Sequence, residues 1–130
     1  MSQINQICKK FKIENYSINS DGSIDVDGVV DLSEKLLEKL PLSFGSVSGH
    51  FSCSDNQLTS LEGSPKTVGG GFYCENNRLT SLKFAPKTVG GDFYCHNNQL
   101  TSLEFVPKTI GGWFYCHNNQ FKHPYDQYIS

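Results

Sequence analysis

The chain has 130 residues, with 11 Lys and Arg against 13 Asp and Glu and a formal net charge of −2. This near balance gives no global electrostatic reason to expect binding to nucleic acid or to an anionic membrane. The length suits one domain, and no apolar run approaches the ~20 residues of a membrane-spanning helix.

The first residues, MSQINQ, lack the basic start and the long apolar core of a signal peptide. We therefore expect a protein of the cytoplasm. Nothing in the composition indicates a cofactor, and we predict none.

The N-terminal segment predicts a short helix followed by a β-hairpin. Within residues 2–12 the apolar residues recur with helical spacing on one face, and Ser2 suits the N-cap. Residues 16–18 and 24–26 alternate between apolar and polar side chains around a turn-forming stretch, 19–22. We interpret residues 1–25 as a cap that covers the end of the structure that follows.

The rest of the chain is a tandem repeat with a period of 21 residues. The sequence FYCENNRLTSL begins at Phe72 and returns at Phe93 as FYCHNNQLTSL, with a related copy from Phe51 and a partial copy from Phe114. The same register extends back to a divergent copy around Val30. A fixed period of this size predicts stacked coils, because one coil cannot bury its apolar face alone.

We predict five such coils over residues 26–121 and a short C-terminal tail over residues 122–130. Each coil is expected to contain a strand, a turn and an extended return. Phe72 and Cys74 would point inward with a period of two. Pro86 falls on the return, where no ladder hydrogen bond is needed.

Two columns of residues recur at the bends of the coils. A glycine precedes each strand and is expected to permit a tight bend or an unusual φ. An asparagine follows each repeated cysteine by three residues and is expected to hydrogen-bond the turn backbones of neighbouring coils. The glycines are Gly28, Gly49, Gly70, Gly91 and Gly112, and the asparagines are Asn56, Asn77, Asn98 and Asn119.

One cysteine recurs in each of four coils at an inward position. Free cysteine packs as a small apolar residue, so a buried column of thiols is the preferred interpretation. Disulfides between adjacent coils would need suitable Cβ geometry, and a zinc site would need four convergent ligands. The column consists of Cys53, Cys74, Cys95 and Cys116.

These repeats resemble the leucine-rich repeat, L-x-x-L-x-L-x-x-N-x-L. Phe72, Cys74, Asn77 and Leu79 match its second to fifth marked positions, whereas Gly69 stands at the first. The short, 21-residue form is similar to repeats of secreted bacterial effectors and of small proteins encoded by tailed phages. The resemblance implies an α+β solenoid with a curved parallel β-sheet and a concave recognition face. The ubiquitin-ligase domain that such effectors often attach has no counterpart of sufficient length in this chain.

Residues that alternate with the inward Phe and Cys are expected to face outward in three stripes, with parallel neighbours ~4.8 Å apart. Tyr and Trp are enriched in binding hot spots, so the tyrosine stripe predicts a binding surface, although cross-strand packing also accounts for it. The predicted partner-binding residues are Tyr73, Asp92, Tyr94, His96, Trp113, Tyr115, His117 and Tyr125.

Two further groups of side chains have competing interpretations. Glu75, His96 and His117 share one stripe, where they would hydrogen-bond a partner or have no special role. A flat face converges poorly for zinc, so no metal is predicted. Three lysines recur on the return and indicate either a phosphate-binding stripe or a solvated face. They are Lys66, Lys87 and Lys108.

The leading functional hypothesis is a non-catalytic protein–protein interaction module. No catalytic triad, phosphate loop or acid pair appears outside the repeat pattern, so we do not expect an enzyme. The phage resemblance implies a protein that binds and inhibits a bacterial host protein, such as part of a defence system, in the host cytoplasm. Binding of carbohydrate or another small ligand on the same aromatic face is the alternative. The aromatic C-terminal end, residues 113–128, is expected to serve partner docking or a homodimer.

Overall fold

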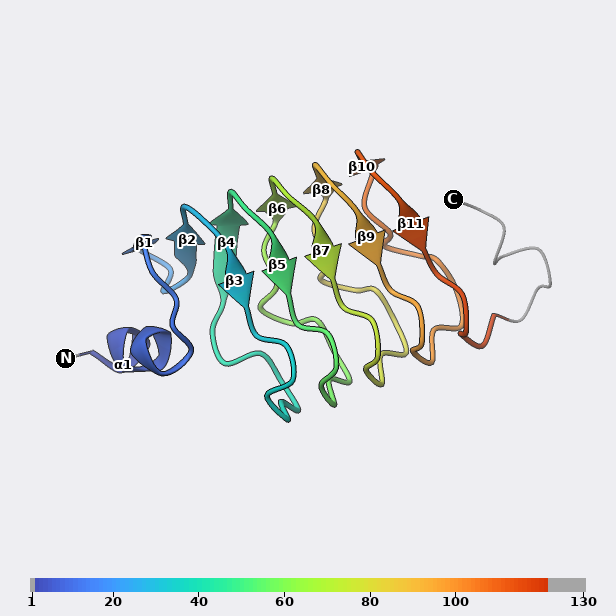
Figure 1. The fold of residues 1–130 in the computed structure, drawn as a ribbon, viewed down its shortest axis with the longest axis horizontal. Coiled ribbons are helices and arrows are strands. Elements are labelled where there is room, and N and C mark those ends of the chain that lie inside the picture. Colours follow the sequence, from blue (N-terminus) through green and yellow to red (C-terminus); the bar gives the residue numbers. More distant parts are fainter. Residues whose placement is uncertain (1, 122–130) are drawn as a thin grey trace.

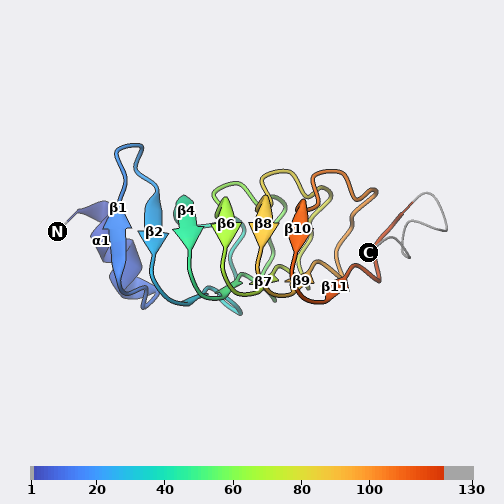
Figure 2. The same ribbon diagram turned by 90° about the horizontal axis from the view of Figure 1, so that it is seen from above.

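The computed structural model of the chain describes residues 2–121 and has the architecture of a β-solenoid (Figures 1 and 2). Successive coils follow one another along a nearly straight line in both views. Two sheets run along this line. Sheet A has the order β1-β2-β4-β6-β8-β10, and sheet B has the order β11-β9-β7-β5-β3.

The strands are short, and most contain two residues. Sheet A consists of β1 (Tyr16–Ile18), β2 (Ile24–Val26), β4 (Phe44–Val47), β6 (Thr67–Val68), β8 (Thr88–Val89) and β10 (Thr109–Ile110). Sheet B consists of β3 (Val30–Asp31), β5 (Phe51–Ser52), β7 (Phe72–Tyr73), β9 (Phe93–Tyr94) and β11 (Phe114–Tyr115). All pairings are parallel except that of β1 with β2.

The predicted N-terminal helix and hairpin are confirmed. Helix α1 (Gln3–Lys10) begins after Ser2, whose side chain accepts a hydrogen bond from the backbone N–H of Asn5 at 3.2 Å. The hairpin pairs Tyr16 with Val26 in antiparallel register. Strand β2 also pairs with β4, so the second strand of the hairpin already belongs to the parallel stack. Strand β1 therefore forms the N-terminal edge of sheet A.

The 21-residue register is confirmed from Val26 onward, whereas a register shift in β2 pairs Ile24 with Phe44. Phe72 pairs with both Phe51 and Phe93, and Val30 pairs with Phe51. The divergent first coil therefore stacks in the same register as the clear copies. The phenylalanine rings form a continuous buried column, in which Phe51, Phe72 and Phe93 stack at centroid distances of 5.4 and 5.6 Å.

Each coil contributes two strands where the sequence pattern indicated one. The stretch 68–74 is divided by a corner at Gly69–Gly71, so that β6 enters sheet A and β7 enters sheet B. The corner keeps its hydrogen bonds between coils, because the N–H of Gly69 donates to Val47 O at 2.9 Å and that of Gly70 donates to Gly49 O at 3.0 Å. A strand can therefore turn without leaving backbone groups unpaired.

Close approach between coils, rather than an unusual φ, explains the corner glycines. Within the predicted column, only Gly28 has a positive φ, of 142°. A Cβ atom on Gly69 would lie 2.2 Å from the carbonyl oxygen of Ser48, and one on Gly90 would lie 2.2 Å from that of Gly69. Gly69 and Gly90, which have these close contacts, each lie one residue before a glycine of the predicted column.

The cysteine column is buried and reduced, as the preferred interpretation predicted. None of the five cysteines, Cys8 included, forms a disulfide, and all five are buried. Burial raises the pKa of Cys74 well above its ordinary value, which disfavours the reactive thiolate. The recurring thiols therefore act as small core side chains.

The buried asparagines have the predicted role at the turns. Asn77 is only 8% exposed, and its Nδ2 donates to the carbonyl oxygens of Cys53 and Cys74 at 3.0 and 3.2 Å. Its Oδ1 accepts from the N–H of Leu58 at 2.9 Å. One amide therefore satisfies the backbone of two coils.

No helix in residues 2–121 is long and apolar enough to cross a membrane.

Candidate binding face

The outward side chains of sheet B form a continuous aromatic ladder. Tyr73 and Tyr94 meet edge to face at a centroid distance of 5.0 Å, and Tyr94 and Tyr115 stack at 4.6 Å with 14° between their planes. Because the strands are in register at 21 residues, each ring lies beside the equivalent ring of the next coil. We name the surface formed by these tyrosines with Glu75, His96, His117 and Trp113 the aromatic face.

The two histidines extend the aromatic face sideways. His96 stacks on His117 at 4.5 Å, and its ring also lies 5.6 Å from Tyr94 and 5.9 Å from Tyr115. Burial lowers the pKa of His96, and the neighbouring His117 lowers it further. His96 is therefore biased toward the neutral form, in which one ring nitrogen accepts a hydrogen bond.

The stripe beside the tyrosines has a structural role at the corners. Asp92 Oδ1 accepts from the backbone N–H of Trp113 at 2.8 Å, and His50 Nδ1 accepts from that of Gly71 at 2.8 Å. His50 and Asp92, two coils apart, thus both accept a hydrogen bond from the corner backbone of the next coil, although their side chains differ in chemical type. Trp113 itself is 70% exposed.

Gly71 makes room for Tyr73. A Cβ atom on Gly71 would lie 2.3 Å from the hydroxyl oxygen of Tyr73, so the ring leans over the corner of its own coil. The pKa of Tyr73 is raised by burial first, and then by the negative charges of Asp92 and Glu75. Both carboxyl groups therefore lie near the start of the tyrosine ladder.

Two buried polar atoms of the face have no hydrogen-bond partner. They are Oε1 of Glu75 and Nδ1 of His96, and they are the only such side-chain atoms in the described part of the chain. Burial raises the pKa of Glu75, and the charge of Asp55 adds to this shift. Glu75 was not among the predicted site residues, although its place in the histidine stripe could have indicated it.

The structure brings most of the predicted site residues to one side of sheet B. Tyr73, Tyr94 and Tyr115 form the ladder, His96 and His117 flank it on one side, and Asp92 and Trp113 follow the corner on the other. Tyr125 and the rest of the predicted C-terminal docking segment beyond residue 121 lie outside the described residues.

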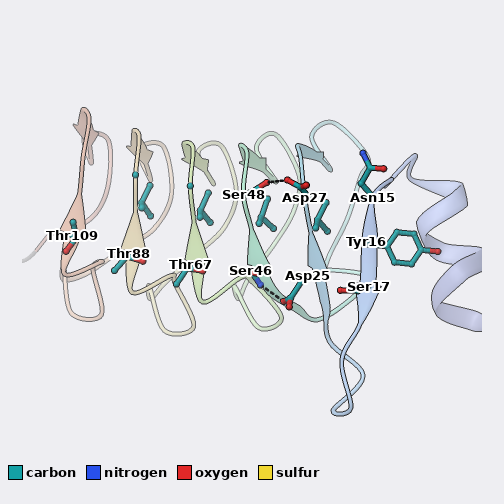
Figure 3. A pocket seen from close by; sticks show the side chains of 16 residues that line it. Asn15, Tyr16, Ser17, Asp25, Asp27, Ser46, Ser48, Thr67, Thr88 and Thr109 are labelled. Atoms are coloured by element: carbon teal, nitrogen blue, oxygen red, sulfur yellow. Dashed lines mark hydrogen bonds between the residues drawn. The ribbon is translucent and has the colours of Figure 1, made fainter.

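A second surface, which the sequence analysis did not single out, runs along the outside of sheet A. It is a shallow groove of about 730 Å³, and Figure 3 shows Thr67, Thr88 and Thr109 in a row on successive strands. At the N-terminal end of the groove, Asp25 Oδ1 accepts from the N–H of Ser46 at 2.9 Å. Tyr16 points away from this groove toward α1 (Figure 3).

The acidic groups of this groove are already satisfied by the protein. Asp25 also accepts from Asn19 Nδ2 at 3.2 Å, and Ser48 Oγ donates to Asp27 at 2.8 Å. The hydrogen bonds from Asn19 and from the N–H of Ser46 lower the pKa of Asp25. The groove therefore offers hydroxyl groups and glycine backbone along its length, and two hydrogen-bonded carboxyl groups, Asp25 and Asp27, at its N-terminal end.

The predicted lysine column lies on the exposed return of the coils. Lys66, Lys87 and Lys108 are exposed, and their backbones stack in register, with Lys87 N–H donating to Lys66 O at 2.9 Å. Among residues 2–121, no group of three or more His, Cys, Asp or Glu side chains is placed to hold a metal ion.

Comparison with known proteins adds no relative to this description. No protein-family model, no curated protein and no solved structure matches the chain. The strand pairing itself shows a parallel β-solenoid with a 21-residue period.

Proposed function

We propose that the protein is a non-catalytic binding module that covers a surface of another protein with its aromatic face. The observation that carries this proposal is the continuous ladder of Tyr73, Tyr94 and Tyr115 on the outside of sheet B, with the exposed Trp113 beside its C-terminal end.

The composition of the face also favours a protein partner. Exposed Tyr and Trp side chains supply large contact areas with little loss of conformational entropy, and they dominate interface hot spots. Trp113 is 70% exposed and Tyr115 is 39% exposed, next to the partly buried Tyr94. The face thus combines apolar contact area with specific polar groups.

The resemblance to short leucine-rich repeats supports a finer proposal. Repeats of this type in small phage-encoded proteins make a bacterial host protein the partner to test first, with inhibition as the result of binding. This step rests on analogy with other repeat proteins. The C-terminal coil, which carries Trp113 and Tyr115, would make the largest contribution, and a homodimer through the same end is the simplest competing assembly.

Affinity capture from bacterial lysate tests the proposal. We expect the wild-type protein to retain a partner that a Trp113→Ala/Tyr115→Ala variant loses. A Thr67→Ala/Thr88→Ala variant, altered on the outside of sheet A, serves as the matched control and should retain it. Equal retention by all three proteins would place the interaction elsewhere, and light scattering over a concentration series separates a partner from self-association.

Carbohydrate binding is the second candidate, and the exposure of Trp113 beside Tyr115 favours it, because sugar rings stack on such side chains. The chain has one Trp, so a shift of its emission on titration with a neutral oligosaccharide reports this mode directly. A saturable shift that Tyr115→Ala abolishes, without any captured protein, would favour carbohydrate over a protein partner.

A further inference from the structure

We propose that the groove between helix α1 and the turns of the first three coils binds an acidic, amphipathic segment of a protein partner. The inference is independent of the proposed function, because this groove shares no residue with the aromatic face. It follows from one exposed leucine, from the apolar lining of the groove and from the charges at its rim.

This groove, which we name the α1 groove, has a volume of about 910 Å³ and is lined from two sides. Helix α1 lies at the N-terminal end of the stack (Figure 1), and Ile7 and Phe11, from α1 and its C-cap, form one side. The turn of the first coil, residues 36–41, forms the other, and Gln57 and Arg78 of the next two coils complete the lining. Because neighbouring coils lie ~4.8 Å apart, the groove extends over about 10 Å of the stack, which is about two turns of a helix.

Leu36 exposes an apolar side chain in this groove where every other coil has a long polar residue. The equivalent positions, at the 21-residue spacing, are Gln57, Arg78, Gln99 and Gln120. Leu36 is 78% exposed and has a φ of 58°, a conformation that costs free energy for a bulky residue. Neither burial nor backbone preference therefore explains a leucine here, and such departures from local rules are concentrated at functional positions.

The rim of the α1 groove carries more positive than negative charge. Lys10, Lys39 and Arg78 are exposed there, against one acidic residue, Glu38, although the whole chain has a formal net charge of −2. None of the three cations forms an ion pair within residues 2–121. Lys10 Nζ lies 5.6 Å from the ring centroid of Phe11, so charge and apolar surface are adjacent. A partner with carboxylate groups beside apolar side chains therefore complements both.

The concave shape of the groove favours a protein segment over a membrane surface. A bilayer takes up apolar side chains that project from a protein, whereas Ile7, Phe11 and Leu37 line the groove while partly buried against the core. An amphipathic helix presents apolar side chains at i and i+4 about 5–6 Å apart, which fits the length of the groove, and its apolar face can lie in a groove of this kind. Carboxylates beside that face would meet the cations of the rim.

The test uses fluorescently labelled, capped peptides of about 12 residues with the full-length protein. In the probe, leucines at helical spacing are flanked by glutamates. One counterpart has glutamine in place of every glutamate, and another has alanine in place of every leucine. Fluorescence anisotropy measures the affinities. We expect the probe to bind at least about tenfold more tightly than either counterpart, with an affinity that falls as salt is added.

Variants locate the interaction and separate binding from folding. Leu36→Asn removes the apolar side chain and suits the positive φ, so we expect the probe to bind about tenfold more weakly or less while the thermal midpoint is equal to that of wild type or higher. Arg78→Gln introduces the residue that the next coil carries at this position, and it should weaken binding of the probe. Lys87→Gln, which removes an exposed positive charge outside the groove, is the matched control and should leave the affinity unchanged.

Any of four results would overturn the inference: no saturable binding of the probe, equal affinity for the glutamine counterpart, unchanged affinity in Leu36→Asn, or equal weakening by Arg78→Gln and Lys87→Gln. If the probe does not bind but vesicles of phosphatidylserine and phosphatidylcholine do, and Leu36→Asn abolishes this, the groove contacts a lipid surface instead. Lysate capture that depends on Trp113 and Tyr115 reports on the aromatic face alone, so either proposal can fail without the other.

Discussion

At the residue scale, each clear repeat places two consecutive asparagines at its turn, and the two have different tasks. Asn77 is buried and bonds to the backbone of two coils. Asn76 is exposed, has a φ of 58° and joins a second amide ladder, in which Asn97 Nδ2 donates to Asn76 Oδ1 at 2.7 Å. Asparagine tolerates the left-handed region better than most residues, so one side-chain type suits both positions.

Replacing the buried asparagine should cost far more than replacing the exposed one. Asn77→Ala leaves backbone groups of two coils unpaired in the core, for which we expect a loss of roughly 2–4 kcal/mol of unfolding free energy. Asn76→Gly removes an exposed side chain with its hydrogen bonds to Asp55 and Asn97 but keeps the positive φ, for which we expect less than about 1 kcal/mol. Urea denaturation measures both, and equal losses would contradict the assigned roles.

The partly buried carboxyl group of Glu75 should reduce stability at neutral pH. Burial raises its pKa in the folded protein, so between the unfolded and folded pKa values the folded state binds more protons than the unfolded state. The contribution of Glu75 to stability therefore falls as pH rises through that window, which begins at the ordinary value of 4.5.

We expect Glu75→Gln to be more stable than wild type near neutral pH, with a difference that shrinks toward pH values of about 4. His96 titrates in both proteins, so its opposite effect cancels in the difference. Glu62→Gln is the control and should show no such trend. A difference that is constant with pH would mean that Glu75 has an ordinary pKa in the folded protein.

At the scale of elements, the sequence predicted the helix, the hairpin and the register, because each rests on a local or exactly repeated pattern. It did not separate β6 from β7, because two-residue strands are too short for alternation to show that the chain changes sheet. The positive φ angles of Phe84 and Phe105, of 72° and 70°, also escaped prediction, because bulky residues rarely adopt this conformation. Gly63 has the equivalent position one coil before Phe84 and two coils before Phe105.

The corner between the two sheets yields a prediction about glycine. Gly90→Ala places a Cβ atom 2.2 Å from a backbone oxygen of the coil before it, so the coils must separate locally. We expect it to lower the unfolding free energy by about 2 kcal/mol or more, against less than about 0.5 kcal/mol for Lys87→Ala on the exposed return. Gly91→Ala, where the nearest atoms lie at 3.0 Å, should fall between them. Equal thermal midpoints for Gly90→Ala and Lys87→Ala would show that the corner adapts easily.

At the scale of the whole molecule, the location of the face was predictable and its chemistry was not. The 21-residue spacing alone places Tyr73, Tyr94 and Tyr115 in one line. Whether Glu75 and His96 pair with each other or remain unpaired depends on side-chain conformations and burial, which a sequence pattern does not encode. The same applies to Asp92, whose hydrogen bond to the corner backbone depends on how closely the coils approach.

A stack of coils should lose its structure from the less buried end. Ile110 and Phe114, in the last coil, are only partly buried, whereas Val89 and Phe93, at the equivalent positions one coil earlier, are fully buried. In such arrays stability is close to a sum of terms for each coil and each interface. We therefore expect the amide of Phe93, which donates to Trp113 O at 2.8 Å, to exchange faster than equivalent amides nearer the N-terminus.

Two matched core variants turn this expectation into a test of how stability is distributed. Leu58 and Leu100 occupy equivalent, fully buried positions two coils apart, and truncation of either to Ala costs about 2–5 kcal/mol locally. If the coils are coupled mainly to their neighbours, Leu100→Ala accelerates amide exchange at Phe93 more than at Phe51, and Leu58→Ala has the reverse effect. If both variants accelerate both amides equally, the solenoid unfolds as one cooperative unit. The aromatic face would then depend on every coil for its order, including those that contribute no ring to it.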